Sequence, residues 1–308
     1  MANALEVVKS IKAFGGTGRL SNPIGELAWV LQQTVREDCA QAKQILGDTG
    51  NQGLIENSMF YVQRMIEIGY IFTEVFVRDE YKNWQPKSDT PRIIDLGGDP
   101  GAMSALYWRY RAPNAQITVI EANPATFNVM RKNLARRGLE DIQVINAAVA
   151  GEIDGDATLY LHRPRKGYHT QDYVGKQSMT DSDAFTVTVP KVKLSTLIKE
   201  KEHIDLLKMD IEGSEGDVMC ELAQSGKLGQ VDQIIMEFHH DPVTNPENSL
   251  IKMLNILRIG GFTIEEAHIT IGKGIRNKKK VLLNNIEDIA NINSKVFLTF
   301  SAIRTQKK

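Results

Sequence analysis

Cysteine is scarce in this chain of 308 residues, which has only Cys39 and Cys220. Two cysteines are too few for a disulfide framework or for a metal cluster built from cysteine alone. We therefore expect buried free thiols and a reducing compartment, which favours a cytoplasmic protein.

Long apolar runs and an excess of one charge are also missing. No segment approaches the roughly 18 to 20 apolar residues of a membrane span, and the N-terminal stretch MANALEVVKSIKAF has no long apolar core. Lys and Arg number 37 and Asp and Glu 38, so the net charge of −1 does not attract nucleic acid or a membrane surface. The basic run 273–280 is interpreted as a solvated loop. With 42% hydrophobic residues, we expect a soluble globular protein without nucleic-acid or membrane partners, for which a homo-oligomer stays open.

A complete dinucleotide fingerprint is missing too. In PRIIDLGGDPG, residues 91–101, an apolar run carries Asp95 and breaks into glycines, as a buried strand does before a tight turn and a helix. If Gly98 and Gly101 are the last two glycines of GxGxxG, the first falls on Leu96, and the fingerprint fails. A carboxylate before the turn fits S-adenosylmethionine, whose cationic group favours a nearby acid. A glycine turn without a ligand is the alternative.

Helical spacing dominates the first 80 residues. Apolar residues recur at this spacing from Ile24 to Leu46 and stop at Gly47. A second run, 57–77, is apolar over a wide face, which implies burial. Residues 81–91 are polar with two prolines and predict a linker. We therefore expect residues 1–90 to form a helical annex, either a lid over the site or an oligomer interface.

Strand-like and helix-like segments alternate from residue 91 onward. This order predicts an α/β domain over 91–308, with a parallel sheet and helices on both faces. Segments 156–162 and 185–189 alternate apolar and polar residues and predict an antiparallel β-hairpin within an insert at about 152–190. For the polar loop 163–183 between them, a substrate-binding role and a merely connecting one are weighed equally.

Polar side chains follow five of the expected strands. In an open α/β sheet, ligands bind outside the carboxyl ends of the strands, so these side chains are expected to converge on one crevice. Glu121 lies 26 residues after Asp95, close to the spacing of about 20 at which a carboxylate accepts ribose hydroxyls; a helix-capping acid is the alternative. The groups are Asp95 with the glycine turn, Glu121, Asn146 to Val149, Asp210 with Glu212, and Glu237 with His239 and His240.

This core resembles the class I S-adenosylmethionine-dependent methyltransferases, and the FkbM family in particular. The resemblance runs from about Pro91 to His240 and rests on DLGGDPG, VIEANP, IDLLKMDIEGSE and IIMEFH, with KMDIEG as its most family-specific part. The sequence departs from the family pattern at Asp99 and Pro100, and at Ala122, where a proline is common. The resemblance implies a Rossmann-like, seven-stranded, mostly parallel sheet, S-adenosyl-L-methionine as cofactor, and O-methylation.

The resemblance also predicts cofactor contacts along the strand ends. Lys208 shares a strand face with Asp210, and its simplest interpretation is a buried ion pair. For Asp210 and Glu212, cofactor binding or capping of the next helix is the alternative to catalysis. The expected cofactor-binding residues are Asp95, Gly97, Gly98, Asp99, Gly101, Ser104, Glu121, Ala122, Asn123, Asn146, Ala147, Ala148 and Asp210.

Methyl transfer to an alcohol requires an in-line arrangement and loss of the hydroxyl proton. His239 is the expected general base, with Asp210 and Glu237 as further catalytic residues. Because adjacent strand residues face opposite ways, only one of His239 and His240 should reach the cleft. Asp210, Glu237 and His239 could instead hold Mg²⁺, but this ligand set is unusual for that ion, and we favour base catalysis without a metal.

The sequence thus predicts an O-methyltransferase whose acceptor is a hydroxyl of a small molecule, such as a natural product or a sugar of secondary metabolism. Two alternatives stay open. The first is a catalytically idle nucleotide-binding or scaffold protein on the same fold. The second is methylation of a macromolecule, which the charge balance does not favour for RNA.

Overall fold

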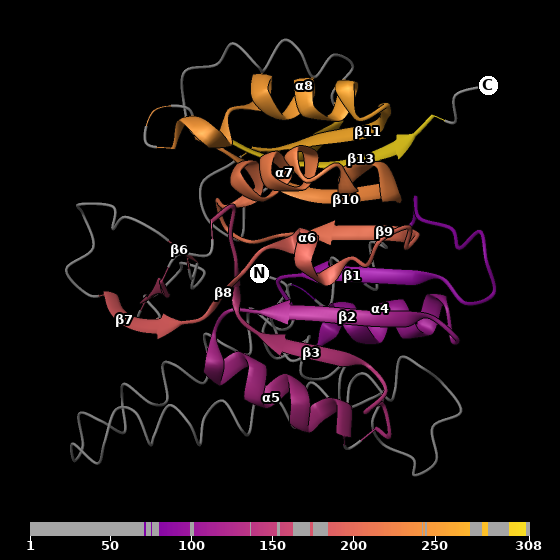
Figure 1. Ribbon diagram of the computed structural model, residues 1–308, viewed down its shortest axis with the longest axis vertical. Helices are drawn as coiled ribbons and strands as arrows, with labels where there is room; N and C mark the ends of the chain where they lie inside the picture. Colours follow the sequence, from indigo (N-terminus) through magenta and orange to yellow (C-terminus); the bar gives the residue numbers. More distant parts are fainter. Residues whose placement is uncertain are drawn as a thin grey trace.

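Eight strands form the central sheet of the computed structural model, in the order β12-β11-β13-β10-β9-β1-β2-β3 (Figure 1). Five neighbouring strands, from β10 to β3, are parallel, whereas β13 pairs antiparallel with both β10 and β11. The expected seven-stranded, mostly parallel sheet is confirmed, and the short strand β12 extends it at one edge. The strands are β1 Arg92–Leu96, β2 Gln116–Glu121, β3 Gln143–Asn146, β9 Ile204–Met209, β10 Val231–His240, β11 Phe262–Ile271, β12 Lys279–Leu282 and β13 Val296–Arg304.

The structure describes 71, 75, 80–98, 102–135, 137–152, 155–162, 173–174, 184–241, 243, 245–271, 279–282 and 296–305. The expected helix at 24–46, most of the one at 57–77, and both Asp99 and Gly101 lie outside the described residues. So does most of the loop 163–183 and of the basic run 273–280, although the last two lysines of that run begin β12.

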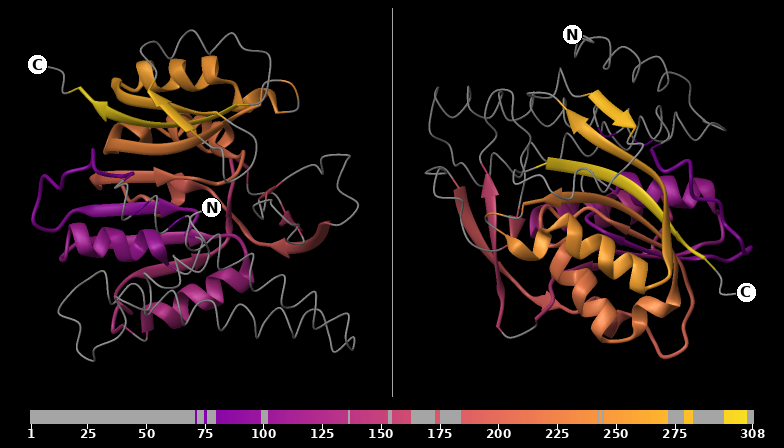
Figure 2. Two further views of the ribbon diagram at one scale, coloured as in Figure 1. Left: turned by 180° about the vertical axis from the view of Figure 1, so that it is seen from behind. Right: turned by 90° about the horizontal axis from the view of Figure 1, so that it is seen from above.

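Helices cover both faces of the sheet, as the alternation of segments predicts. Neighbouring strand residues divide between two cores: Ile93 and Ile235 pack with α4, whereas Ile94 and Ile234 pack with α7 and α8. Figure 2 shows α4 on the opposite side of the sheet from α7 and α8. Because each strand is buried on both faces, its sequence is a nearly continuous apolar run. The helices are α4 Met103–Arg111, α5 Pro124–Ala135, α6 Leu194–Leu197, α7 Glu215–Gln224 and α8 Leu250–Ile259, with the 3-10 turns η2 Lys227–Gln230 and η3 Pro246–Asn248.

The insert after β3 contains the expected antiparallel pair, β5 Ala157–His162 and β7 Ala184–Val189. A third strand, β6 Tyr173–Val174, pairs with β5 and lies within the segment expected to be a polar loop. The inward residues of β5 form a small core with Ala148. The insert is joined to the main domain by a parallel pair, β4 Ala148–Val149 and β8 Lys191–Val192.

The segment before β1 differs from the expected linker. Trp84 is 1% exposed and packs edge-on against Trp108 of α4, with ring centroids 5.6 Å apart. Tyr81 lies against the same indole at 4.9 Å. Residues 85–90 are exposed, as in the expected linker, but Tyr81 and Trp84 attach the start of the segment to the α4 face of the sheet. Across the described part of the chain, no helix combines the length and apolarity needed to span a membrane.

Candidate functional site

The glycine turn after β1 lies against the carboxyl end of β9. Gly97 has a φ of +85°, and a Cβ built there would lie 1.9 Å from the backbone oxygen of Asp210. A Cβ on Gly98 would lie 2.5 Å from the side chain of Val119. The Asp210 N–H donates to the Leu96 carbonyl at 3.0 Å, which joins the two strand ends. Both glycines are therefore required for the close approach of neighbouring strands.

Asp95 lies fully buried beneath this turn. Its Oδ2 accepts a hydrogen bond from Trp108 Nε1 at 2.8 Å, and its Oδ1 lies 3.2 Å from the Lys208 ammonium. Lys208 also donates to the Gly97 carbonyl at 2.6 Å. Burial alone would lower the pKa of Lys208, but the charges of Asp95 and Asp210, together with the hydrogen bond to Asp95, outweigh it and raise that pKa, so the ammonium stays charged. The buried ion pair expected for Lys208 is present, with Asp95 as partner, whereas a direct contact of Asp95 with a cofactor stays a prediction.

Side chains at the ends of β2 and β3 hold the backbone that follows β2. Glu121 is 7% exposed, and its Oε1 accepts the Asn123 N–H at 2.8 Å. Asn123 Oδ1 accepts the N–H of Ala125 in the first turn of α5. Asn146 Nδ2 donates to the carbonyls of Glu121 and Ala122 at 2.8 and 3.0 Å. Asn146 therefore holds the backbone of the β2 end, which gives this residue a local role besides the predicted cofactor contact.

The two alanines after Asn146 meet different partners. The Ala147 N–H donates to the Glu121 carbonyl at 3.2 Å, next to the predicted ribose site. The Ala148 N–H donates to the Pro190 carbonyl at 2.9 Å, and its side chain is buried in the core of the insert. Ala148 therefore contacts the insert.

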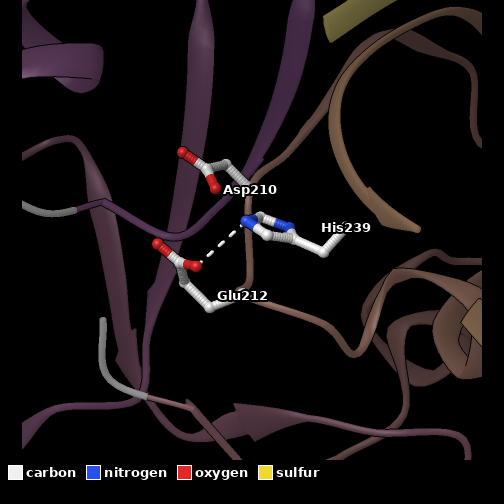
Figure 3. Close-up of side chains that lie close together, drawn as sticks. All are labelled: Asp210, Glu212 and His239. Atoms are coloured by element: carbon white, nitrogen blue, oxygen red, sulfur yellow. Dashed lines mark ion pairs between the residues drawn. The ribbon is translucent and has the colours of Figure 1, made fainter. Parts of the chain in front are cut away.

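His239 at the end of β10 is clamped between two carboxylates. Its Nδ1 lies 2.9 Å from Glu215 Oε1, and its Nε2 lies 2.9 Å from Glu212 Oε2 (Figure 3). Burial alone would lower the pKa of His239, but the charges and hydrogen bonds of Glu215 and Glu212 outweigh it and raise that pKa well above its ordinary value. The ring is therefore a cation at neutral pH with no free lone pair. This geometry runs against the expected role of His239 as the general base.

Glu215 and Asn248 hold this clamp in place. Glu215, the first residue of α7, is fully buried and accepts the Gly213 N–H at 3.0 Å as well as the His239 ring. Asn248 Nδ2 donates to Glu215 Oε2 at 2.8 Å and to the His239 carbonyl at 3.0 Å. Burial would raise the pKa of Glu215, but His239 outweighs it and lowers that pKa. Sequence reasoning assigned the EGSE segment only to helix capping and missed Asn248, for which no local signal exists.

The two neighbouring histidines behave as strand parity predicts. His240 is fully buried on the other face, where its Nδ1 accepts the Leu250 N–H at the start of α8. His239 lies on the face where it contacts Glu212 and Glu215, and its reach into the cleft stays a prediction.

Asp210 and Glu237 line one cavity at the ends of β9 and β10. Burial, the largest influence, raises the pKa of Asp210 to about 6 although the Lys208 charge opposes it. Burial and then the charge of Asp210 raise the pKa of Glu237 to about 8. At neutral pH the first carboxyl is mostly ionised and the second mostly protonated. The cavity is lined by Ile71, Val75, Glu80, Tyr81, Ser104, Lys208, Met209, Asp210, Ile235, Glu237 and Thr299.

The residues that could bind a metal ion differ from the expected set. Ligand atoms of Asp210, Glu212 and His239 lie within 4.8 Å of one another, so Glu212 takes the place expected for Glu237. To bind an ion, His239 would have to lose a proton and its ion pair with Glu212. A hard ion such as Mg²⁺ also prefers oxygen ligands over imidazole. We therefore keep base catalysis without a metal as the working hypothesis.

Comparisons with known proteins agree with the sequence motifs. The family profile described as "Methyltransferase FkbM domain" matches residues 96–264, more than half of the chain. "Methyltransferase 1" of Beauveria bassiana is 26% identical over 168 residues, which cover 50% of this chain and 67% of that protein. "Methyltransferase sdnD" of Sordaria araneosa is 29% identical over 187 residues, which cover 52% and 71%.

Solved structures also match, at lower similarity. A precorrin-6y C5,15-methyltransferase from Geobacter metallireducens is 14% identical with a TM-score of 0.36, covering 70% of this chain and 81% of that one. An O-methyltransferase from Thermotoga maritima is 12% identical with a TM-score of 0.35, covering 76% and 66%.

Proposed function

Because the chain belongs to the FkbM family of methyltransferases, we propose that it transfers the methyl group of S-adenosylmethionine to a hydroxyl oxygen of a small molecule. The observation that carries the proposal is the cavity where Asp210, a buried carboxyl with a pKa of about 6, lies beside Glu237. A base is most effective when its pKa is near the working pH, and a hydroxyl acceptor must lose a proton.

The predicted cofactor residues fit S-adenosylmethionine. The turn at Gly97 and Gly98 exposes backbone ahead of α4, and Glu121 places a carboxylate at the end of β2 for the ribose hydroxyls. The Ser104 hydroxyl is buried and has no hydrogen-bond partner among the described residues, so it is left for a ligand. When bound, the cofactor supplies an electrophilic methyl group. The chain then has to place the acceptor in line and remove its proton.

Asp210 is the better candidate for the base than His239. Its carboxylate is ionised at neutral pH, whereas the imidazole of His239 is protonated and occupied on both nitrogens. The positive charge of His239 favours the ionised form of Asp210. The protonated carboxyl of Glu237 is suited to donate a hydrogen bond to the acceptor oxygen or to Asp210. His239 thus acts as a fixed charge that keeps the base ionised.

The test measures binding and turnover separately. Titration calorimetry with S-adenosylmethionine and S-adenosylhomocysteine should give saturable binding of both, and absence of binding would overturn the proposal. Transfer of a radiolabelled methyl group is then followed over a panel of hydroxylated small molecules, with a protein and an RNA extract as the macromolecular arm. Asp210→Asn should lower transfer by about 10² to 10⁴-fold with binding preserved, whereas Asp141→Asn, at a side chain 61% exposed, is the matched control. Binding without any transfer would favour the idle scaffold.

A further inference from the structure

The cavity at the ends of β9, β10 and β13 has more acidic side chains than the removal of one proton requires. Glu80, Asp210 and Glu237 line it together with the hydroxyl-bearing residues Ser104 and Thr299. We propose that this acid cavity binds an ammonium group of the acceptor, so that the substrate class is an alcohol that also carries a basic amine. The inference rests on the proposed function and adds the substrate class to it.

The strand order places the acid cavity on the acceptor half of the cleft. Of the predicted cofactor contacts, those at Gly97, Glu121 and Asn146 lie at the ends of β1, β2 and β3, on one side of β9, whereas Ser104 and Asp210 line the acid cavity itself. Glu237 and Thr299 lie on the other side of β9, where they are direct neighbours across the β10–β13 pair. A group bound between them is therefore separated from the ribose site by two strands, β9 and β1.

Two buried hydroxyls in the acid cavity lack partners. Ser104 is 4% exposed, and neither its Oγ nor the Oγ1 of Thr299 has a hydrogen-bond partner among the residues that the structure describes. A buried hydroxyl without a partner is costly, so such atoms indicate a missing ligand or water. An ammonium group donates up to three hydrogen bonds, and a carboxylate and two hydroxyls that line the same cavity supply acceptors for them.

The nearby cations are already neutralised by other acids. Lys208 pairs with Asp95, and His239 pairs with both Glu212 and Glu215. In the described part of the chain no ion pair to Asp210 or to Glu237 is formed. Asp210, which is ionised at neutral pH, therefore faces the cavity without an ion-pair partner among the described residues, and a cationic ligand would provide one.

The acid cavity is small. Its free volume of about 40 Å³ holds about three water molecules. An ammonium nitrogen with its first carbon fits in this space. The hydrocarbon side chains of Ile71, Val75 and Ile235 border the same space and can contact that carbon.

The titration of the cavity acids agrees with a cationic ligand. The charges of Asp210, Glu80 and Glu212 raise the pKa of Glu237, and the charge of His239 lowers it. The pKa of Asp210 is also lowered by the charge of Lys208 and raised by that of Glu215. Acids that repel one another bind a cation more tightly once they lose their protons. Ammonium binding should therefore strengthen as the pH rises through the pKa of Asp210, about 6, and near that pH it should release the proton of Asp210, while Glu237 keeps its own.

The test uses ethanolamine as the probe and protein saturated with S-adenosylhomocysteine, so that the ammonium site of the cofactor is already filled. Binding is followed by NMR chemical-shift changes, with ethylene glycol as the neutral control. For so small a ligand we expect a dissociation constant on the order of 1 mM, and binding of ethylene glycol at least tenfold weaker. Glu237→Gln and the shape-conserving Thr299→Val should each weaken ethanolamine several-fold.

Each outcome has a defined meaning. Competition between ethanolamine and S-adenosylhomocysteine would show that the cavity belongs to the cofactor ammonium and would overturn the inference. Equal binding of ethylene glycol, or no effect of both substitutions, would overturn it as well. Failure of S-adenosylhomocysteine to bind would instead remove the proposed function, so the two failures are distinguishable.

Discussion

The imidazole Nδ1 of His239 lies 2.9 Å from Glu215 Oε1, and both side chains are buried. This ion pair turns the expected catalytic base into a cation. It also joins the end of β10 to the start of α7, so the charge state of the site depends on the packing of two elements.

Replacing Glu215 by Gln should lower the pKa of His239, because the substitution removes one of its two negative neighbours. NMR titration of the labelled imidazole measures this pKa directly. Glu152→Gln, at an exposed residue of the insert, is the control. An unchanged His239 pKa would contradict the clamp.

The same pair makes folding stability depend on pH. The raised pKa of His239 gives a contribution that is complete below its unfolded pKa of about 6.5 and is lost as the pH rises through the higher folded value. The lowered pKa of Glu215 gives a contribution that is lost as the pH falls through its folded value. Urea unfolding across pH should therefore show these two losses, and Glu215→Gln should reduce both.

Lys208→Met should destabilise the fold by about 3–5 kcal/mol, because it leaves the Asp95 carboxylate buried without its counter-charge. Urea denaturation measures the loss. Lys87→Met is the matched control, since Lys87 is 63% exposed and its pair with Asp232 should contribute at most about 1 kcal/mol. Similar losses in both variants would show that Asp95 is not stabilised by Lys208.

Gly97→Ala should cost about 2–5 kcal/mol of stability, because the new Cβ meets the Asp210 carbonyl and φ is +85°. Gly138→Ala separates the two causes, since Gly138 also has a positive φ, +65°, but nothing lies within 4 Å of the new Cβ. Its cost should be only the backbone term of about 1–2 kcal/mol. Equal thermal unfolding shifts for both variants would exclude the steric contact.

The pH profile of methyl transfer should be bell-shaped. Activity should rise as Asp210 loses its proton near pH 6 and fall as Glu237 loses its proton near pH 8. Glu237→Gln should remove the fall at high pH, and Asp210→Asn should lower turnover by about 10² to 10⁴-fold. An acidic limb that persists in Asp210→Asn would assign the base role to another residue.

Glu121→Ala should weaken S-adenosylhomocysteine binding by about ten- to a hundredfold, because hydrogen bonds to a charged acceptor are lost. Glu121 Oε1 also accepts the Asn123 N–H, so Glu121→Gln, which keeps this acceptor, separates loss of charge from loss of loop shape. Calorimetry gives both affinities. Unchanged binding in the alanine variant would remove Glu121 from the ribose site.

The strands, the layers and the strand ends that meet follow from local sequence patterns. Apolar runs such as Ile93–Leu96 identify buried strands because both faces must be covered, and glycines after Leu96 identify the close turn. Parity along a strand was enough to separate His239 from His240. These are local properties, and they do not depend on what packs against them.

Which side chains meet, and which of them carry charge, depends on the packing of distant segments. Glu215 and Asn248 lie 24 positions before and 9 after His239, and no local signal links Asn248 to the ring. Trp84, in a polar segment, is buried because α4 offers an aromatic partner. The raised pKa values of Asp210 and Glu237 follow from burial and from neighbouring charges, and that of His239 follows from charges and hydrogen bonds on neighbouring segments. Sequence patterns encode neither the burial of these groups nor the charges around them, because both arise from contacts between distant segments.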